Sequence, residues 1–239
     1  MSECGLGFGQ RVWCAVAWAV FFLPLLWTGC SRSNADLSPQ SKSSAQRAET
    51  LTDAETGLLK ENVAAAFRAV KFPFYVYQDA GIGAFVPDGW MGDSKDVRIN
   101  PQHGGSPHSG KTCVKIEYLP GASQNSRWAG VYWQFPGNYW GKRKGGYDLT
   151  GAKRLGFWAR GELGGEVIQE VKIGGISGTY RDSDSAGIGP ITLTKEWQQF
   201  VINLEGVDLS YISGGFCWST NLDLNKNGCT FYLDDIAYE

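Results

Sequence analysis

Short apolar runs separated by turn residues follow Lys71, and this pattern limits the fold more than any other feature of the chain. The runs alternate with a period of two, and Gly, Pro, Asn and Asp separate them, which is typical of antiparallel strands in a sandwich. Strands are predicted near residues 73–78, 112–118, 128–135, 153–160, 166–173, 197–204, 214–219 and 230–238. We therefore expect an all-β fold, a two-sheet antiparallel β-sandwich of the jelly-roll type, over residues 72–239.

The order of strands in a jelly roll predicts which cysteines can meet. In two-Greek-key order the first, eighth, third and sixth predicted strands form one sheet, and the second, seventh, fourth and fifth form the other. Alternation then places Cys113 and Cys217 outward on neighbouring strands, where a disulfide bond could form. Cys217 with Cys229 is the alternative pairing, because it would clip the final connection.

The N-terminal segment has the features of an export signal. Residues 12–28 are apolar, follow Arg11 and run into Leu26-Trp-Thr-Gly-Cys30, which resembles the lipobox of bacterial lipoproteins. The resemblance implies a signal peptide over residues 1–29 and a lipid on Cys30, which would anchor the protein in the cell envelope, at the outer membrane or cell surface. An uncleaved anchor and ordinary secretion are the alternatives.

Two further segments precede the predicted sandwich. Residues 30–50 are rich in Ser, Gln, Asn and Lys, so they cannot bury enough apolar surface to order and are expected to form a tether. Thr52 and Glu55 form a capping box, and apolar residues recur on one face through Val70. An amphipathic helix is therefore predicted over residues 51–71.

A phosphate-loop pattern, Gly105-Ser-Pro-His-Ser-Gly-Lys-Thr112, is present but lies in the wrong structural context. A phosphate loop needs a helix after it, whereas residues 113–118 alternate with period two and stop before Pro120. The formal net charge is −2, and the sequence has no basic block that would bind nucleic acid. Neither nucleotides nor nucleic acids are expected partners.

Two adjacent carboxylates interrupt the alternation of the last nine residues, Phe231-Tyr-Leu-Asp-Asp-Ile-Ala-Tyr-Glu239. Charge inside a sheet is costly unless a cation such as Ca²⁺, or hydrogen-bond donors on a neighbouring loop, compensates it. Together with Gly130-Val-Tyr-Trp133 and Leu155-Gly-Phe-Trp-Ala-Arg160, the strand resembles the jelly-roll carbohydrate-binding modules of the galactose-binding-like superfamily. That resemblance implies non-catalytic binding of an oligo- or polysaccharide, and a structural Ca²⁺ ion held by Asp79 and by Asp234 or Asp235.

Exposed aromatic rings beside polar side chains are the expected sugar contacts, because an indole offers an apolar plate to the C–H face of a pyranose. Two surfaces are candidates, the loop edge near residues 89–93, 138–141 and 182–184, which we favour, and the outward sheet face with Lys115 and Glu117. The candidate contacts are Trp90, Asp93, Trp128, Tyr132, Trp140, Trp158, Arg160 and Asp184.

Two other functions remain open from the sequence. Paired loop carboxylates could serve a polysaccharide-active enzyme of the glycoside hydrolase kind, although no pair stands out and no nucleophile or metal-helix motif is present. A structural envelope lipoprotein could use the sandwich to hold a protein partner. Binding without catalysis is the function that we favour.

Overall fold

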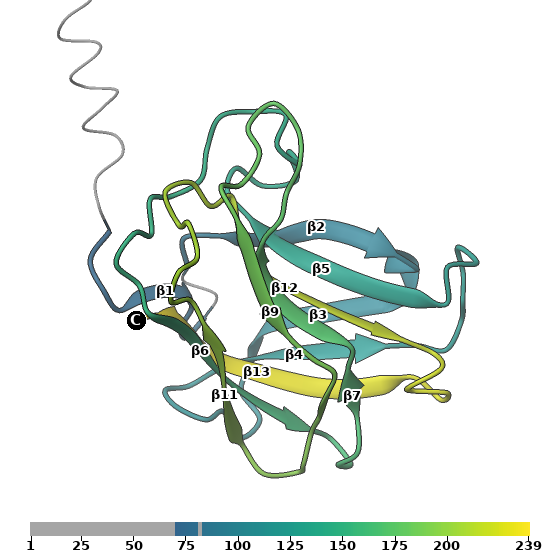
Figure 1. Cartoon of the computed structure of the whole chain (residues 1–239). Helices are drawn as coiled ribbons and strands as arrows, with labels where there is room; N and C mark the ends of the chain where they lie inside the picture. The colour runs from purple at the N-terminus through teal and green to yellow at the C-terminus, as the bar shows by residue number, and fades with distance from the viewer. Residues whose placement is uncertain (1–69, 81–82) are drawn as a thin grey trace, which may run out of the picture. The chain divides into compact units, whose positions relative to one another are not determined.

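The computed structural model describes residues 70–80 and 83–239, and these form a β-sandwich (Figure 1). The chain divides into two units, residues 1–54 and 55–239, and every described residue belongs to the second. The predicted signal peptide, Cys30, the tether and residues 51–69 of the predicted helix lie outside the described residues. Within the described part no helix has the length and apolar composition needed to cross a bilayer.

The first sheet has the strand order β11-β6-β13-β4-β3, and β1 also pairs with β13. Every pairing in this sheet is antiparallel. The bounds are β1 Phe74–Tyr77, β3 Val97–His103, β4 Cys113–Tyr118, β6 Arg154–Gly161, β11 Gln198–Asn203 and β13 Cys229–Tyr238. The last strand, β13, lies at the centre of this layer, which is the lower one in Figure 1.

The second sheet has the strand order β2-β5-β12-β8-β9 and is also antiparallel throughout. A separate two-stranded ladder, β7 with β10, and a short 3₁₀ turn, η1, complete the described elements. The bounds are β2 Val86–Gly92, η1 Ser94–Asp96, β5 Trp128–Gln134, β7 Val167–Ile168, β8 Glu170–Gly174, β9 Ser185–Ile188, β10 Ile191–Thr192 and β12 Gly214–Asn221.

Inward-facing side chains of both sheets form one hydrophobic core. Trp133 and Trp218 come from the second sheet, Phe231 comes from the first, and all three are at least 98% buried. The Trp218 and Phe231 rings meet edge to face with centroids 5.1 Å apart, an arrangement that aromatic pairs favour. The apolar residues that alternate in the sequence therefore fill the space between the two facing sheets.

The structure confirms the predicted sandwich and the predicted strand regions, but it contradicts the predicted sheet membership. The strand at 128–135 belongs to the second sheet, and those at 112–118 and 153–160 belong to the first. The physical reason is that alternation fixes which face of a strand meets the core, whereas it leaves open which strand supplies the backbone partners.

The predicted disulfide bond is wrong for the same reason. Cys113 lies on β4 in the first sheet and Cys217 on β12 in the second, so the core separates them. Cys229 begins β13 in the first sheet, which also excludes the alternative pairing with Cys217. All three thiols are free.

Candidate functional site

A polar groove crosses the outer face of the second sheet and is the best candidate for a binding site. One part is a hollow of about 490 Å³ beside Trp128 on β5 and Ser219 and Asn221 on β12. The adjoining part, of about 480 Å³, continues past Gln169, which lines both parts, to Gly187 and Gly189 at β9. We refer to the two parts together as the groove.

Trp128 supplies the aromatic surface of the groove. Its side chain is 40% exposed, and the residue pairs in register with Asn221 of β12. Gly92 lies directly beneath it: a Cβ atom on Gly92 would come within 2.2 Å of the Trp128 carbonyl oxygen and 3.1 Å of the indole Cδ2. Because Gly92 also has a φ of +62°, any other residue there would be strained and would push the ring away.

Asp93 holds the turn that leads into Trp128. Its carboxylate accepts hydrogen bonds from the backbone N–H groups of Gln124, Ser126 and Arg127, at 2.9, 3.0 and 2.6 Å. The Asp93 N–H in turn donates to the Trp128 carbonyl at 2.8 Å. Desolvation raises the pKa of Asp93, but the three N–H donors outweigh it and the net pKa lies below the ordinary value. Asp93 is therefore ionised, and its carboxylate holds the turn that positions Trp128.

The polar groups along the groove are amides, hydroxyl groups and two ion pairs. Asn221 Nδ2 donates to Gln169 Oε1 at 3.0 Å, which links β12 to the start of β8. Arg127 pairs with Asp223 at 2.7 Å beside Trp128. Further along, Glu170 pairs with Lys172 at 3.4 Å. The groove thus combines one apolar ring surface with hydrogen-bonding groups, and each carboxylate that lines it is paired with a cation. This combination suits a neutral, hydroxyl-rich ligand.

The structure does not bring the other predicted loop-edge residues into this groove. Tyr132 is only 4% exposed and Asp93 is fully buried, so neither can contact a ligand directly, which corrects both predictions. Trp140 packs edge to face on Tyr132 at 5.7 Å, and its indole N–H donates to Asn138. Asp184 is exposed, but its carboxylate accepts from the N–H groups of Ser185 and Asp208. These side chains stabilise loops.

Trp90 is exposed but faces away from the groove. It pairs with Val131, whose side chain lies in the core, so the indole projects from the opposite side of the second sheet to Trp128. Its exposed fraction of 42% is nearly that of Trp128. The two tryptophans therefore differ in location and hardly at all in exposure.

On the outer face of the first sheet, the predicted plate Trp158 is already covered. The His108 ring stacks on Trp158 with centroids 3.7 Å apart and planes inclined by 16°. Arg160 lies with its guanidinium 3.8 Å from the centre of the Tyr232 ring. A ligand could stack on Trp158 only after His108 moved, so this face is a weaker candidate than the groove.

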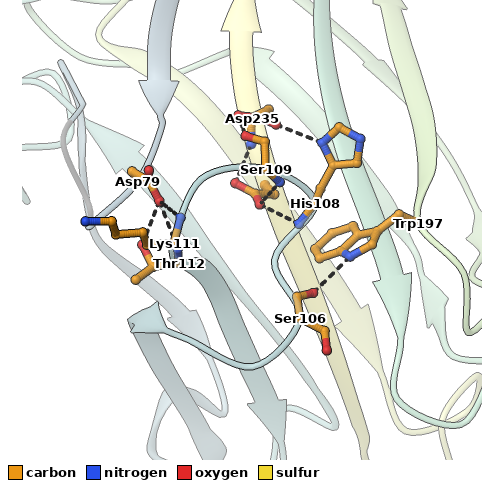
Figure 2. A network of polar contacts seen from close by, with 9 residues as sticks. Asp79, Ser106, His108, Ser109, Lys111, Thr112, Trp197 and Asp235 are labelled. Atoms are coloured by element: carbon orange, nitrogen blue, oxygen red, sulfur yellow. Dashed lines mark hydrogen bonds and ion pairs between the residues drawn. The ribbon is translucent and has the colours of Figure 1, made fainter.

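The loop at 104–112 brings His108 to that position, and three aspartates hold it (Figure 2). Asp234 accepts from the His108 and Ser109 N–H groups, at 2.9 and 3.3 Å. Asp235 accepts from Ser109 Oγ at 2.9 Å and contacts His108 Nδ1 at 2.8 Å. A β-bulge in β13, with Asp235 at a φ of 45°, lets both consecutive carboxylates reach this loop.

Asp79 anchors the other end of the same loop. The Lys111 and Thr112 N–H groups both donate to Asp79 Oδ1, at 2.7 and 2.8 Å. The sequence predicts that a cation or donors on a neighbouring loop compensate the carboxylates of the last strand. For Asp234 the structure confirms the loop donors. The backbone N–H groups that a phosphate loop would offer to an anion are likewise occupied here.

Donors on the loop already engage the predicted calcium ligands in this arrangement. Asp79, Asp234 and Asp235 all accept hydrogen bonds from the loop, so a bound ion would share these carboxylates with the loop donors. The described part of the chain contains no group of three or more His, Cys, Asp or Glu side chains that could hold a metal. Calcium binding remains a prediction from the sequence resemblance.

Trp128 is predicted from the sequence, but its neighbours in the groove are not. Ser219 and Asn221 follow Cys217 at intervals of two along β12, so they lie on the same outward face as Trp128. That signal was available in the sequence once β12 was paired with β5. Gln169 and Arg127 come from connections between strands, and no pattern in the sequence points to them.

Solved structures with a similar arrangement include carbohydrate-binding modules. A family 30 module has 15% sequence identity over 70% of this chain and 97% of that chain, with a TM-score of 0.48. A family 11 module from Clostridium thermocellum, in complex with a β-1,3-1,4-mixed-linked tetrasaccharide, has 14% identity over 63% of this chain and 84% of that chain, with a TM-score of 0.42. An arabinose-bound α-L-arabinofuranosidase has 15% identity over 65% of this chain and 24% of that chain, with a TM-score of 0.40. No protein-family model and no curated sequence matches.

Proposed function

We propose that the protein binds a neutral oligo- or polysaccharide in the groove without cleaving it. The observation that carries this proposal is Trp128, a rigidly supported and exposed indole beside the Asn221 and Gln169 amides. A sugar ring stacks its C–H face on the indole, and the amides and Ser219 hydrogen-bond its hydroxyl groups. The two carboxylates that line the groove, Asp223 and Glu170, are both paired with cations, and no observation favours a hydrolytic pair.

Affinity electrophoresis of the full-length protein through gels that contain soluble polysaccharides tests this proposal. Burying about 100 Å² of ring face at about 25 cal/mol per Å² yields about 2.5 kcal/mol, so Trp128→Ala should weaken binding about 60-fold. Trp90→Ala is the matched control, because it removes an equally exposed indole from the other side of the sheet. It should leave retardation unchanged.

Three outcomes contradict the proposal. If both variants lose retardation equally, the gel polysaccharide binds exposed tryptophan side chains in general and not this groove. No retardation by any neutral or charged glycan would favour a structural protein that holds a protein partner. Release of shorter sugars from the gel polysaccharide would favour the enzyme.

We also propose that the protein is exported and carries lipid on Cys30, a segment that lies outside the described residues. The lipobox-like sequence before Cys30 supports this proposal. Bacterial cells that express the protein and are fed labelled palmitate should incorporate label into it, and Cys30→Ala should abolish the incorporation. Label retained in the variant contradicts attachment at this residue.

A further inference from the structure

A separate pocket lies at one end of the sandwich and shares no lining residue with the groove. The connections 162–166, after β6, and 225–228, before β13, form its walls together with the end of β4. Its volume is about 420 Å³, within the range of about 300 to 1,000 Å³ that is typical of small-molecule sites. We call it the end pocket.

Two residues that line the end pocket, Tyr118 and Glu166, each have a buried polar atom without a hydrogen-bond partner. Glu166 is 8% exposed, and its Oε1 accepts from the Leu163 N–H at 2.6 Å, whereas its Oε2 has no donor. Tyr118 is 1% exposed, and its hydroxyl group also has no partner. Buried polar groups are almost always satisfied, because burying one without a partner costs free energy. Both atoms therefore have hydrogen-bonding capacity that a ligand could fill.

Glu166 is placed by a residue without a side chain. A Cβ atom on Gly161 would fall 1.9 Å from Glu166 Oε2, so the carboxylate occupies the space that a larger residue at position 161 would fill. Burial, together with the nearby charges of Asp93 and Asp96, raises the pKa of Tyr118 to about 12, so this hydroxyl group stays protonated. The pocket thus offers one carboxylate oxygen and one neutral hydroxyl group.

The charge around the end pocket is negative and not balanced by an ion pair. Glu162 also lines the pocket, and its carboxylate accepts from the Tyr232 hydroxyl group at 2.5 Å. Lys226 lines the pocket, but within residues 70–80 and 83–239 it forms no ion pair with Glu162 or Glu166. A buried carboxylate without a cation is unfavourable, and an ammonium group brings both the positive charge and the missing donors.

We propose that the end pocket binds a small ligand through a primary ammonium group, which donates to Glu166 Oε2 and contacts the Tyr118 hydroxyl group. The rest of the ligand occupies the pocket between Glu162 and the 225–228 connection. This site is independent of the groove, because the two surfaces have different residues and different charge. It gives the protein a second ligand class, amines of the size of a monosaccharide, such as amino sugars.

Ligand-observed NMR titrations of the full-length protein at pH 6 test the proposal with three probes: glucosamine, N-acetylglucosamine and glucose. Only glucosamine carries an ammonium group, so it should bind at least tenfold more tightly than the other two. Glu166→Gln keeps the Oε1 acceptor for Leu163 but removes the charge, and it should reduce glucosamine affinity at least tenfold. Glu205→Gln, which removes an exposed carboxylate elsewhere, is the matched control and should change nothing.

Tyr118→Phe provides a second test if Glu166→Gln fails to fold, because it deletes only one hydroxyl group. It should lower glucosamine affinity several-fold while N-acetylglucosamine binding stays absent. Equal binding of the three probes, or unchanged affinity in Glu166→Gln and Tyr118→Phe, overturns the proposal. Failure here leaves retardation by polysaccharide gels unaffected, so the end pocket and the groove are judged separately.

Discussion

At the scale of single residues, the environment of a side chain decides its role more than its type does. Trp90 and Trp128 are exposed to nearly the same degree, yet only Trp128 lies beside amides and a hydroxyl group. Asp93 has the residue type expected of a sugar ligand, but it is fully buried and serves backbone N–H groups. Its hydrogen bonds hold the turn that places Trp128.

The Asp93 carboxylate should make binding sensitive to acid. Its folded-state pKa is lowered below 3.8, so the stability that it contributes is present above that value and is lost as the pH falls through the folded-state pKa. We expect Trp128 fluorescence and gel retardation to change together below about pH 3.8.

Asp93→Asn tests the cause of that acid transition. The neutral amide places its own N–H donors near the three backbone donors, so the variant should bind several-fold more weakly at pH 7. It should also lose the acid transition. An unchanged acid transition in Asp93→Asn would assign the titration to another carboxylate.

At the scale of elements, the bulge in β13 and the loop at 104–112 form one unit. The bulge turns two consecutive carboxylates toward the loop, and the loop then brings His108 onto Trp158. The sequence motif that resembles a phosphate loop thus covers a sheet face. The sequence indicates that these aspartates need a cation or loop donors, but it does not indicate which donors, because those that reach Asp234 lie 125 and 126 positions away in the chain.

Gly110→Ala should release this loop. The residue has a φ of +60°, and a Cβ atom would fall 2.0 Å from Asp79 Oδ2. Hydrogen exchange of the amides at 108–112 should become at least tenfold faster, and iodide should quench Trp158 fluorescence more strongly. Gly104→Ala is the matched control, because the nearest atom to its Cβ would be 3.8 Å away. Equal exchange in the two variants would contradict the anchoring role of Asp79.

Removal of divalent cations separates the two explanations of these aspartates. Because loop donors already satisfy the carboxylates, we expect EDTA to leave the thermal midpoint of the full-length protein unchanged. A lower midpoint in EDTA that Ca²⁺ restores would show that an ion binds after all.

At the scale of the whole described domain, the sequence predicts the class of fold and the inward faces, because both follow from alternation. It does not predict β2 and β3, since Pro87, Gly89 and Pro101 read as turn residues, whereas register shifts accommodate them inside strands. It also does not predict which strands share a sheet, since a long central strand such as β13 can pair with several partners.

The sheet assignment has a direct chemical test. With Cys113 and Cys217 in opposite sheets, alkylation after unfolding without reductant should find both as free thiols by peptide mass mapping. Reductant should not lower the thermal midpoint. Burial raises the pKa of Cys113 to about 11, so this thiol should react with alkylating agents only after unfolding. A peptide that links the two cysteines would contradict the topology.

The far side of the groove ends at β9, an edge strand, where Gly187 and Gly189 carry no side chain that could close it. A glycan that lies across the sheet can therefore extend past this edge with either its reducing or its non-reducing end leading. Recognition would then need no reducing or non-reducing terminus, and every internal stretch of a long polymer would count as a binding position.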